Sequence, residues 1–279
     1  MSVRVTAVPW ICLMVAVVFV PATRGDDSRQ VSSVPDQLRE ALELDPFYAK
    51  HVSAGGLPVL SSAKVSDAAL VEAAALINHM LDGREDIRQA MIERKVRFVV
   101  MAPDEMTTDV PEQRDMRPKA YWDARARGLG GQICSCGEEN LLNLPGDRYS
   151  VENILIHEFS HTIHNFGLKS VDPEFDERLK KTFERSLAAG RWDKTYAATN
   201  HEEYFAEGVQ DYFDCNATSP REGVHNDVNT RDELRAYDPE LFALIDEVFR
   251  QNPWRYVRYD ARQPASAESR AESAAPASP

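Results

Sequence analysis

The fold of this chain is decided by the stretch Ile154-Leu155-Ile156-His157-Glu158-Phe159-Ser160-His161-Thr162-Ile163-His164. Its apolar residues predict a partly buried helix. On a helix, residues four apart lie about 40° apart around the axis, so His157 and His161 project from one face and can share a metal ion. Glu158 is offset by about 100°. We therefore expect its carboxylate beside the open position of that ion.

Two neutral imidazoles at this spacing are typical ligands of Zn²⁺, and a catalytic zinc takes one more protein ligand and keeps a water in its fourth position. Zinc lowers the pKa of such a water to about 7, and Glu158 is placed to take its proton. The alternative interpretation is a buried helix that carries two unrelated histidines. The flanking residues support a helix, with Ser150 and Glu152 expected at its start and Gly167 at its end.

A second predicted helix, over residues 200–213, contains two acidic residues one turn apart, Glu203 and Glu207. They lie on one face of the helix. Glu203 could complete the zinc shell, and Glu207 could accept the outer N–H of a ligating histidine and fix its tautomer. Glu202 competes with Glu203, but the position four residues after it is occupied by Ala206. The alternative is an ordinary solvated acidic face, and the upstream motif makes us favour the ligand interpretation.

Two stretches together resemble the catalytic domain of the anthrax lethal factor-like zinc metallopeptidases, a gluzincin group. They are His-Glu-Phe-Ser-His at 157–161 and Tyr-Ala-Ala-Thr-Asn-His-Glu-Glu-Tyr-Phe-Ala-Glu at 196–207. The resemblance implies a zincin-like metallopeptidase fold, peptide hydrolysis and one Zn²⁺ per chain. It is confined to residues 150–213, and Ser160 replaces a glycine common in the family's motif. The implied roles are zinc ligation by His157, His161 and Glu203, general base catalysis by Glu158, a phenol near the metal from Tyr196, and an outer carboxylate from Glu207.

In the implied mechanism, Glu158 removes a proton from the zinc-bound water and later passes it to the leaving amine, while Tyr196 donates a hydrogen bond to the developing oxyanion. Tyr196 could equally be a packing residue of its loop. Three further histidines, His164, His201 and His225, are predicted not to be ligands, because two imidazoles and one carboxylate already complete the shell.

The charge of the chain limits its partners. It has 32 Lys and Arg against 45 Asp and Glu, a formal net charge of −13. No basic cluster of the kind that binds nucleic acid is present, so DNA and RNA are excluded as expected partners. A peptide or protein substrate is expected, and the oligomeric state stays open. Two other functions remain: a zinc hydrolase that acts on another amide or cell-wall linkage, and a non-catalytic zinc-containing binding module.

The amino-terminal residues predict a targeting segment. Arg4 precedes an uncharged apolar run over residues 5–20, and Val20-Pro21-Ala22 resembles a cleavage site, so residues 1–22 are interpreted as a signal peptide. The mature chain is then exported and has no stable membrane insertion, with an uncleaved amino-terminal anchor as the alternative. At the other end, residues 261–279 are rich in Ala, Ser, Pro and Glu, which predicts a disordered tail.

Between these ends we expect a linker and one α+β domain, mainly helical, with a small sheet and the HExxH active-site helix. The best strand is expected over residues 97–101 and a second over 140–144, where an edge strand could align an extended peptide. A long loop is expected over residues 103–132. The predicted parts are the linker (23–34) and the domain (35–260), which divides into a helical scaffold (35–95), a strand and loop part (96–149), the zinc-site helices (150–213) and a C-terminal helix (232–250).

Within the domain, helices are expected over residues 35–50, 67–81, 87–93, 174–188, 200–213 and 232–250. In the last of these, Pro239 is expected to be the true first residue of the helix. Three cysteines would remain after signal cleavage: Cys134, Cys136 and Cys215. In an exported protein, a disulfide from Cys215 to one of the other two is expected.

Overall fold

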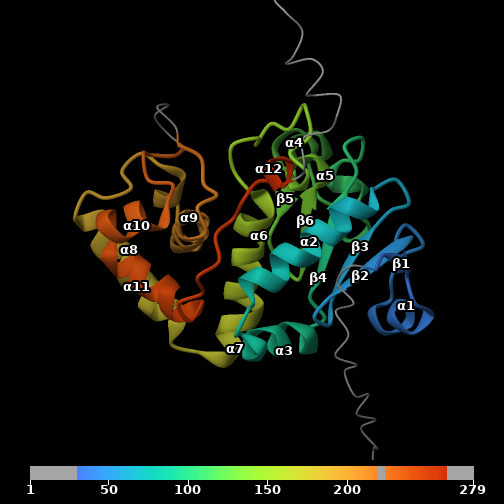
Figure 1. The fold of residues 1–279 in the computed structure, drawn as a ribbon, viewed down its shortest axis with the longest axis horizontal. Helices are drawn as coiled ribbons and strands as arrows, with labels where there is room; N and C mark the ends of the chain where they lie inside the picture. Colours follow the sequence, from blue (N-terminus) through green and yellow to red (C-terminus); the bar gives the residue numbers. More distant parts are fainter. Residues whose placement is uncertain (1–29, 219–223, 263–279) are drawn as a thin grey trace, which may run out of the picture.

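The computed structural model describes residues 30–218 and 224–262. The predicted signal peptide, most of the predicted linker and all but two residues of the predicted tail lie outside the described residues. Figure 1 shows two lobes, with the sheet on the right, helices from α8 (Phe175–Ala188) to α11 (Pro239–Val248) on the left, and α6 (Ile154–Thr162) between them. None of the described helices combines the length and the apolar character needed to cross a membrane.

A six-stranded mixed sheet organises the right-hand lobe, in the order β1-β2-β3-β4-β6-β5. The neighbours β3, β4 and β6 run parallel, whereas β1, β2 and β5 form antiparallel pairs. Because β5 pairs with β6 alone, it is an edge strand. The strands are β1 (Ser32–Ser33), β2 (Lys50–Ala54), β3 (Leu57–Ser61), β4 (Arg97–Met101), β5 (Gly128–Leu129) and β6 (Ile133–Gly137).

The strand β4 coincides with the strand predicted over residues 97–101. Phe98 and Val100 belong to a large apolar cluster shared with α2 (Asp67–Met80) and α6, whereas Val99 and Met101 belong to a smaller cluster packed against α1 (Asp36–Leu42). A strand covered on both faces is apolar almost throughout rather than alternating. This explains why the sequence signal was strong here.

The helices α2 and α3 (Glu85–Glu93) connect β3 to β4 and match the helices predicted over residues 67–81 and 87–93. The hydroxyl of Ser66 caps α2 by accepting the N–H of Ala69. The predicted helix over residues 35–50 is wrong beyond its first half. α1 stops at Leu42 because Glu43 turns to a positive φ of 52°, and the chain then enters β2 at Lys50.

The helix α6 starts later than predicted. Its N-cap is Asn153 rather than Ser150, and the Asn153 side-chain oxygen accepts the N–H of Ile156 at 3.0 Å. Ser150 lies in a turn before the helix. An Asn side chain at this position satisfies a donor that the helix itself leaves unpaired.

The helix also does not end at Gly167. It continues without a break into a π-helical segment (η4, Ile163–Leu168) and then into α7 (Lys169–Val171). Gly167 serves a close approach instead, because a Cβ atom there would lie 2.6 Å from Cγ2 of Ile87 on α3. The expected helix stop was therefore wrong, and the glycine is a packing requirement.

The left-hand lobe consists of helices after α7. α8 and α9 (His201–Tyr212) match the helices predicted over residues 174–188 and 200–213. The predicted C-terminal helix is two helices, α10 (Arg231–Tyr237) and α11. Pro239 is the first residue of α11, as expected, and Asp238 caps it by accepting the N–H of Leu241 at 3.2 Å.

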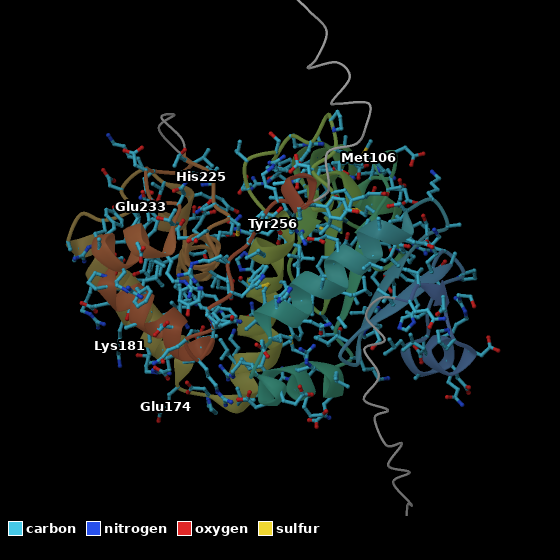
Figure 2. All side chains as sticks on the ribbon, viewed as in Figure 1. Met106, Glu174, Lys181, His225, Glu233 and Tyr256 are labelled. Carbon is cyan, nitrogen blue, oxygen red and sulfur yellow. The ribbon has the colours of Figure 1, made fainter. Side chains whose placement is uncertain are left out.

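After α11 the chain returns to the sheet lobe, and α12 (Tyr259–Arg262) is the last described helix, on a path that Figure 1 shows in red. Trp254, Tyr256 and Tyr259 pack against the large apolar cluster. Figure 2 places Tyr256 between the two lobes, where its backbone N–H donates to the carbonyl of Phe213 at 2.8 Å. The segment from Trp254 to Tyr259 therefore connects the two lobes through packing and a backbone hydrogen bond.

The strand predicted over residues 140–144 is wrong. This stretch contains the short helix α5 (Glu138–Leu141), and the strand before α6 is β6 instead. The side chain of Asn140 joins the loop to α6, because its Nδ2 donates to the carbonyl of Glu152 at 2.9 Å and its Oδ1 accepts the N–H of Ile154 at 2.8 Å. These tertiary bonds override the apolar pattern.

The predicted loop over residues 103–132 contains structure of its own, ending in the edge strand β5. It holds two short 3₁₀ helices, η2 (Thr107–Asp109) and η3 (Pro111–Gln113), and the helix α4 (Lys119–Arg125). The disulfide prediction is also wrong, since Cys134, Cys136 and Cys215 are free and buried. The α+β fold class, mainly helical with a small sheet, is confirmed.

Candidate metal centre

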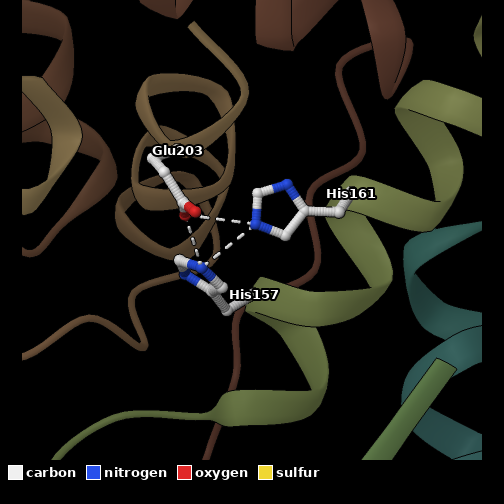
Figure 3. Close-up of side chains that lie close together, drawn as sticks. All are labelled: His157, His161 and Glu203. Carbon is white, nitrogen blue, oxygen red and sulfur yellow. Dashed lines mark hydrogen bonds and ion pairs between the residues drawn. The ribbon is translucent and has the colours of Figure 1, made fainter. Parts of the chain in front are cut away.

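Two capped helices bring the predicted site residues together. α6 contacts β6 on one side and α9 on the other. The N-cap of α9 is Asn200, whose Oδ1 accepts the N–H groups of Glu202 and Glu203, both at 2.8 Å. The first turn of α9 is thereby fixed next to the middle of α6. Figure 3 shows that His157 and His161 point from α6 toward Glu203.

The three side chains form a compact triangle of ligand atoms. Oε2 of Glu203 lies 3.1 Å from Nε2 of His157 and 3.2 Å from Nε2 of His161, and the two nitrogens are 3.3 Å apart. Ligands held at about 2.0–2.1 Å by a tetrahedral ion lie about 3.3 Å from one another. The observed triangle therefore has the size of three corners of such a tetrahedron, and these residues could hold a metal ion.

The electrostatics of the triangle favour a positive charge. Burial lowers the pKa of His157, but the hydrogen bond to Glu203 and the charges of Glu158, Glu207 and Glu203 outweigh it and raise the pKa to about 10. Burial raises the pKa of Glu203, yet its bonds to His157 and His161 lower it overall. A cation at this place has carboxylates on several sides.

Glu158 stands beside the triangle and is held against the edge of the sheet. Burial raises its pKa, while the two imidazoles and a hydrogen bond from the backbone of Gly130 act in the opposite direction. A Cβ atom at Gly130 would lie 2.6 Å from Cβ of His161 and 2.8 Å from the carbonyl oxygen of Glu158. The chain after β5 can approach α6 this closely only because it lacks a side chain here.

Gly128 makes the same close approach one turn earlier on α6. A Cβ atom there would lie 2.5 Å from Cγ2 of Ile154 and 2.9 Å from Cγ of Glu158. We expect Gly128→Ala to lower the free energy of unfolding by about 1–3 kcal/mol through overpacking, and to displace the Glu158 side chain. Urea unfolding measures the first effect and activity per folded molecule the second. Parent-like values of both would contradict the packing argument.

The outer nitrogen of His157 has a partner that the sequence did not reveal. Nδ1 lies 2.8 Å from Oε1 of Gln210 and 3.5 Å from Oε1 of Glu207, the predicted partner. The amide orientation of Gln210 is fixed, because its Nε2 donates to the carbonyl of Asn153 at 3.2 Å and to Glu152 at 3.3 Å. Gln210 therefore accepts the Nδ1 proton and leaves Nε2 of His157 free to face the triangle.

The carboxylate of Glu207 interacts with His225, which lines the cavity of the site. Its Oε2 lies 3.1 Å from Nδ1 of His225 and accepts a bond from Asn216 at 3.1 Å. Nε2 of His225 lies 3.9 Å from Glu152. Figure 2 shows His225 in the left-hand lobe. The spacing of Glu203, Glu207 and Gln210 along one helical stripe could have revealed Gln210, whereas no sequence signal marks His225.

We expect Gln210→Leu to weaken zinc affinity about 10–100-fold, because the ring of His157 loses the acceptor that orients it. Titration against a chelator of known affinity measures this. Gln113→Leu is the matched control, since Gln113 is also buried but bonds to Ser135 away from the triangle. Equal zinc affinities for the two variants would contradict the orienting role.

Tyr196 and a cavity complete the surroundings of the triangle. Tyr196, at the start of a 3₁₀ helix (η5, Tyr196–Ala198), donates from its hydroxyl to Oε1 of Glu203 at 2.9 Å. Burial and the charge of Glu203 raise the pKa of its phenol, so it stays a donor. A cavity of about 600 Å³ opens here, lined by the triangle, Glu158, Tyr196 and β5.

The other histidines lie outside the triangle. Nε2 of His164 and of His201 both approach Oδ1 of Asp176, at 3.0 Å and 3.1 Å. Burial and the charge of Lys169 lower the pKa of His164 to about 4, so its ring is neutral. These two residues form a separate cluster at the side of α8.

Comparison with solved structures gave a weak likeness to a peptidase. No family model matches the chain, and no curated protein matches it. The solved structure of the PRO-PRO endopeptidase PPEP-2 from Paenibacillus alvei superposes with a TM-score of 0.42 and 18% sequence identity, covering 63% of this chain and 90% of that one. A likeness this weak supports no conclusion about activity.

Proposed function

We propose that this protein is an exported zinc metallopeptidase of the gluzincin type. The observation that carries the proposal is the triangle of His157, His161 and Glu203 at tetrahedral spacing, with the carboxylate of Glu158 beside it in an open cavity. Two imidazoles and one carboxylate are a typical catalytic zinc set, which leaves a fourth position for water. Export rests on the amino-terminal sequence pattern alone, and the lethal factor-like grouping rests on the sequence of residues 157–161 and 196–207 alone.

The residues of the site divide the work of hydrolysis. When bound, zinc supplies Lewis acidity, which lowers the pKa of a water to about 7 and polarises a carbonyl. Glu158 accepts the water proton and returns it to the leaving amine. With substrate bound, the hydroxyl of Tyr196 would turn its single donor from Glu203 to the oxygen on which charge develops. Gln210 keeps His157 in the required tautomer, and the carboxylate of Glu207 lies near the same ring nitrogen.

An extended peptide can pair with the edge strand β5. Its neighbour in the sheet, β6, occupies one side, and Gly128, Leu129 and Gly130 line the cavity beside Glu158. An unpaired strand edge aligns a peptide through backbone hydrogen bonds. β5 thus takes the role that we predicted for residues 140–144.

Digestion of a denatured protein mixture tests the proposal. The zinc-loaded chain should generate new peptide ends, and a chelator should stop the reaction until zinc is restored. New ends are read by mass spectrometry, which also identifies the bonds that are cut fastest. Cell-wall amides are tested in parallel. If the protein cleaves the cell-wall amides but leaves all peptides intact, the second hydrolase function would be favoured over the peptidase. If it cleaves neither substrate, the non-catalytic binding module would be favoured.

A further inference from the structure

The cavity contains one arginine whose charge is neutralised by the protein and one whose charge is not. Arg127 is fully engaged: its Nε and Nη2 bond to both carboxylate oxygens of Glu139, at 2.6 Å and 2.8 Å, and its remaining donors bond to backbone carbonyls. Arg125 bonds through Nη1 to the hydroxyl of Tyr121 at 3.0 Å. Within residues 30–218 and 224–262, no carboxylate forms an ion pair with Arg125.

Arg125 is held at the wall of the cavity by its backbone. It is the last residue of α4, and its carbonyl accepts the hydroxyl of Tyr149 at 2.9 Å. The preceding turn of α4 is fixed by Asp123, whose Oδ1 accepts the N–H of Thr108 at 3.0 Å and its hydroxyl at 2.8 Å. The backbone is anchored, while the side chain is exposed toward the cavity.

The guanidinium of Arg125 lies beside the phenol of Tyr196, and both residues line the cavity that contains the triangle. Its charge acts on the phenol of Tyr196 and lowers the pKa that burial and Glu203 raise. Tyr196 in turn donates to Glu203. A group bound by Arg125 would therefore lie close to Tyr196, and hence close to the reacting bond.

Three carboxylates of the cavity interact with groups other than Arg125. Glu203 and Glu158 lie with the imidazoles of the triangle, and Glu207 bonds to His225. A guanidinium offers parallel N–H donors that match a carboxylate, so a cation left without an anion in a binding cavity is suited to an anion of the substrate. This holds although the chain as a whole is acidic.

We propose that Arg125 binds a carboxylate of the substrate next to the cleaved bond, so that the enzyme prefers peptides with Asp or Glu, or a free C-terminus, at that position. The inference rests on the proposed peptidase function. The two sources of the carboxylate share the same chemistry and are separated by experiment.

The test uses matched synthetic peptides built around the bond that is cut fastest in the digestion. For each position that flanks the cleaved bond, one pair of peptides differs only by Glu or Gln at that position, and both peptide ends are blocked. A second pair differs only in a free acid or an amide at the C-terminus. We expect kcat/KM of the parent to be about 10–100-fold higher for the carboxylate member of one pair, the range of a charge-assisted hydrogen bond.

Variants of Arg125 assign the effect. The preference is the ratio of kcat/KM for the carboxylate member of a pair to kcat/KM for its neutral member. Arg125→Gln should bring this ratio close to one, Arg125→Lys should keep it above that of Arg125→Gln, and Arg125→Glu should bring it below one. Lys119→Gln removes one positive charge from the same helix outside the cavity, where Lys119 lies near Asp109 and Asp123, and should keep the preference. Added salt should weaken the preference, because the side chain is exposed.

Three outcomes would overturn the inference. The parent could cut both members of every pair equally. Arg125→Gln could lower kcat equally for both members, which would assign Arg125 to the positioning of Tyr196. Lys119→Gln could abolish the preference as strongly as Arg125→Gln. Absence of any chelator-sensitive cleavage is a different result, since it would refute the proposed function itself.

Discussion

Glu158→Gln is expected to bind zinc like the parent and to hydrolyse peptides about 10²–10⁴-fold more slowly, the loss that follows removal of a general base. The amide has the same size and still accepts the bond from Gly130, but it cannot take a proton from water. Because burial raises the pKa of Glu158, its charged form is disfavoured by the fold. The neutral amide should therefore not lower the melting temperature.

The measurements for Glu158→Gln are zinc content after dialysis, melting temperature, and kcat on the peptide that is cut fastest. Glu202→Gln is the matched control, since Glu202 also lines the cavity and follows Asn200 in the same turn as Glu203. It should keep both zinc and activity. A Glu158→Gln protein as active as the parent would show that Glu158 is not the proton acceptor of this reaction.

His161→Ala is expected to lose bound metal altogether at concentrations that saturate the parent. One corner of the triangle disappears, and a missing ligand should cost more than the 10–100-fold typical of an outer partner. His161 is the better choice than His157, whose ring also bonds to Gln210 in the interior. The described bonds of the His161 ring lie within the triangle.

The readout for His161→Ala is thermal unfolding with and without zinc. A ligand at about 100 times its dissociation constant stabilises a native state by about 2.7 kcal/mol, so the parent should gain stability and the variant should not. Melting of the two chelated proteins at a similar temperature is the control for folding. An equal zinc-dependent shift in both proteins would refute His161 as a ligand.

The parts of this structure that depend on local spacing were predictable. The helix period alone placed His157 and His161 on one face of α6, and the four-residue interval placed Glu203 and Glu207 on one face of α9. The strand β4 was predictable because a strand buried on both sides keeps a continuous apolar run. The limits of α2, α8 and α9 followed from helical periodicity.

Two errors next to the candidate metal centre, the start of α6 and the strand over residues 140–144, share one physical cause. Ser150 is as good a cap as Asn153 by chemistry, and residues 140–144 have a strand-like apolar pattern. In the structure, the amide of Asn140 bonds to Glu152 and Ile154, which turns the loop into α5 and moves the start of α6. Bonds between residues distant in sequence are not visible in a local pattern, and they decide between locally similar alternatives.

The sequence by itself determined which residue types form the candidate metal centre and which helices carry them, because both follow from spacing within one element. Only the tertiary structure decided which group orients His157, where the edge strand lies, and that Arg125 enters the cavity without an anion. The contacts of Gln210, Gly130 and Arg125 each join different elements. Their energies depend on where the chain returns in space, and a helical or strand period contains no information about that.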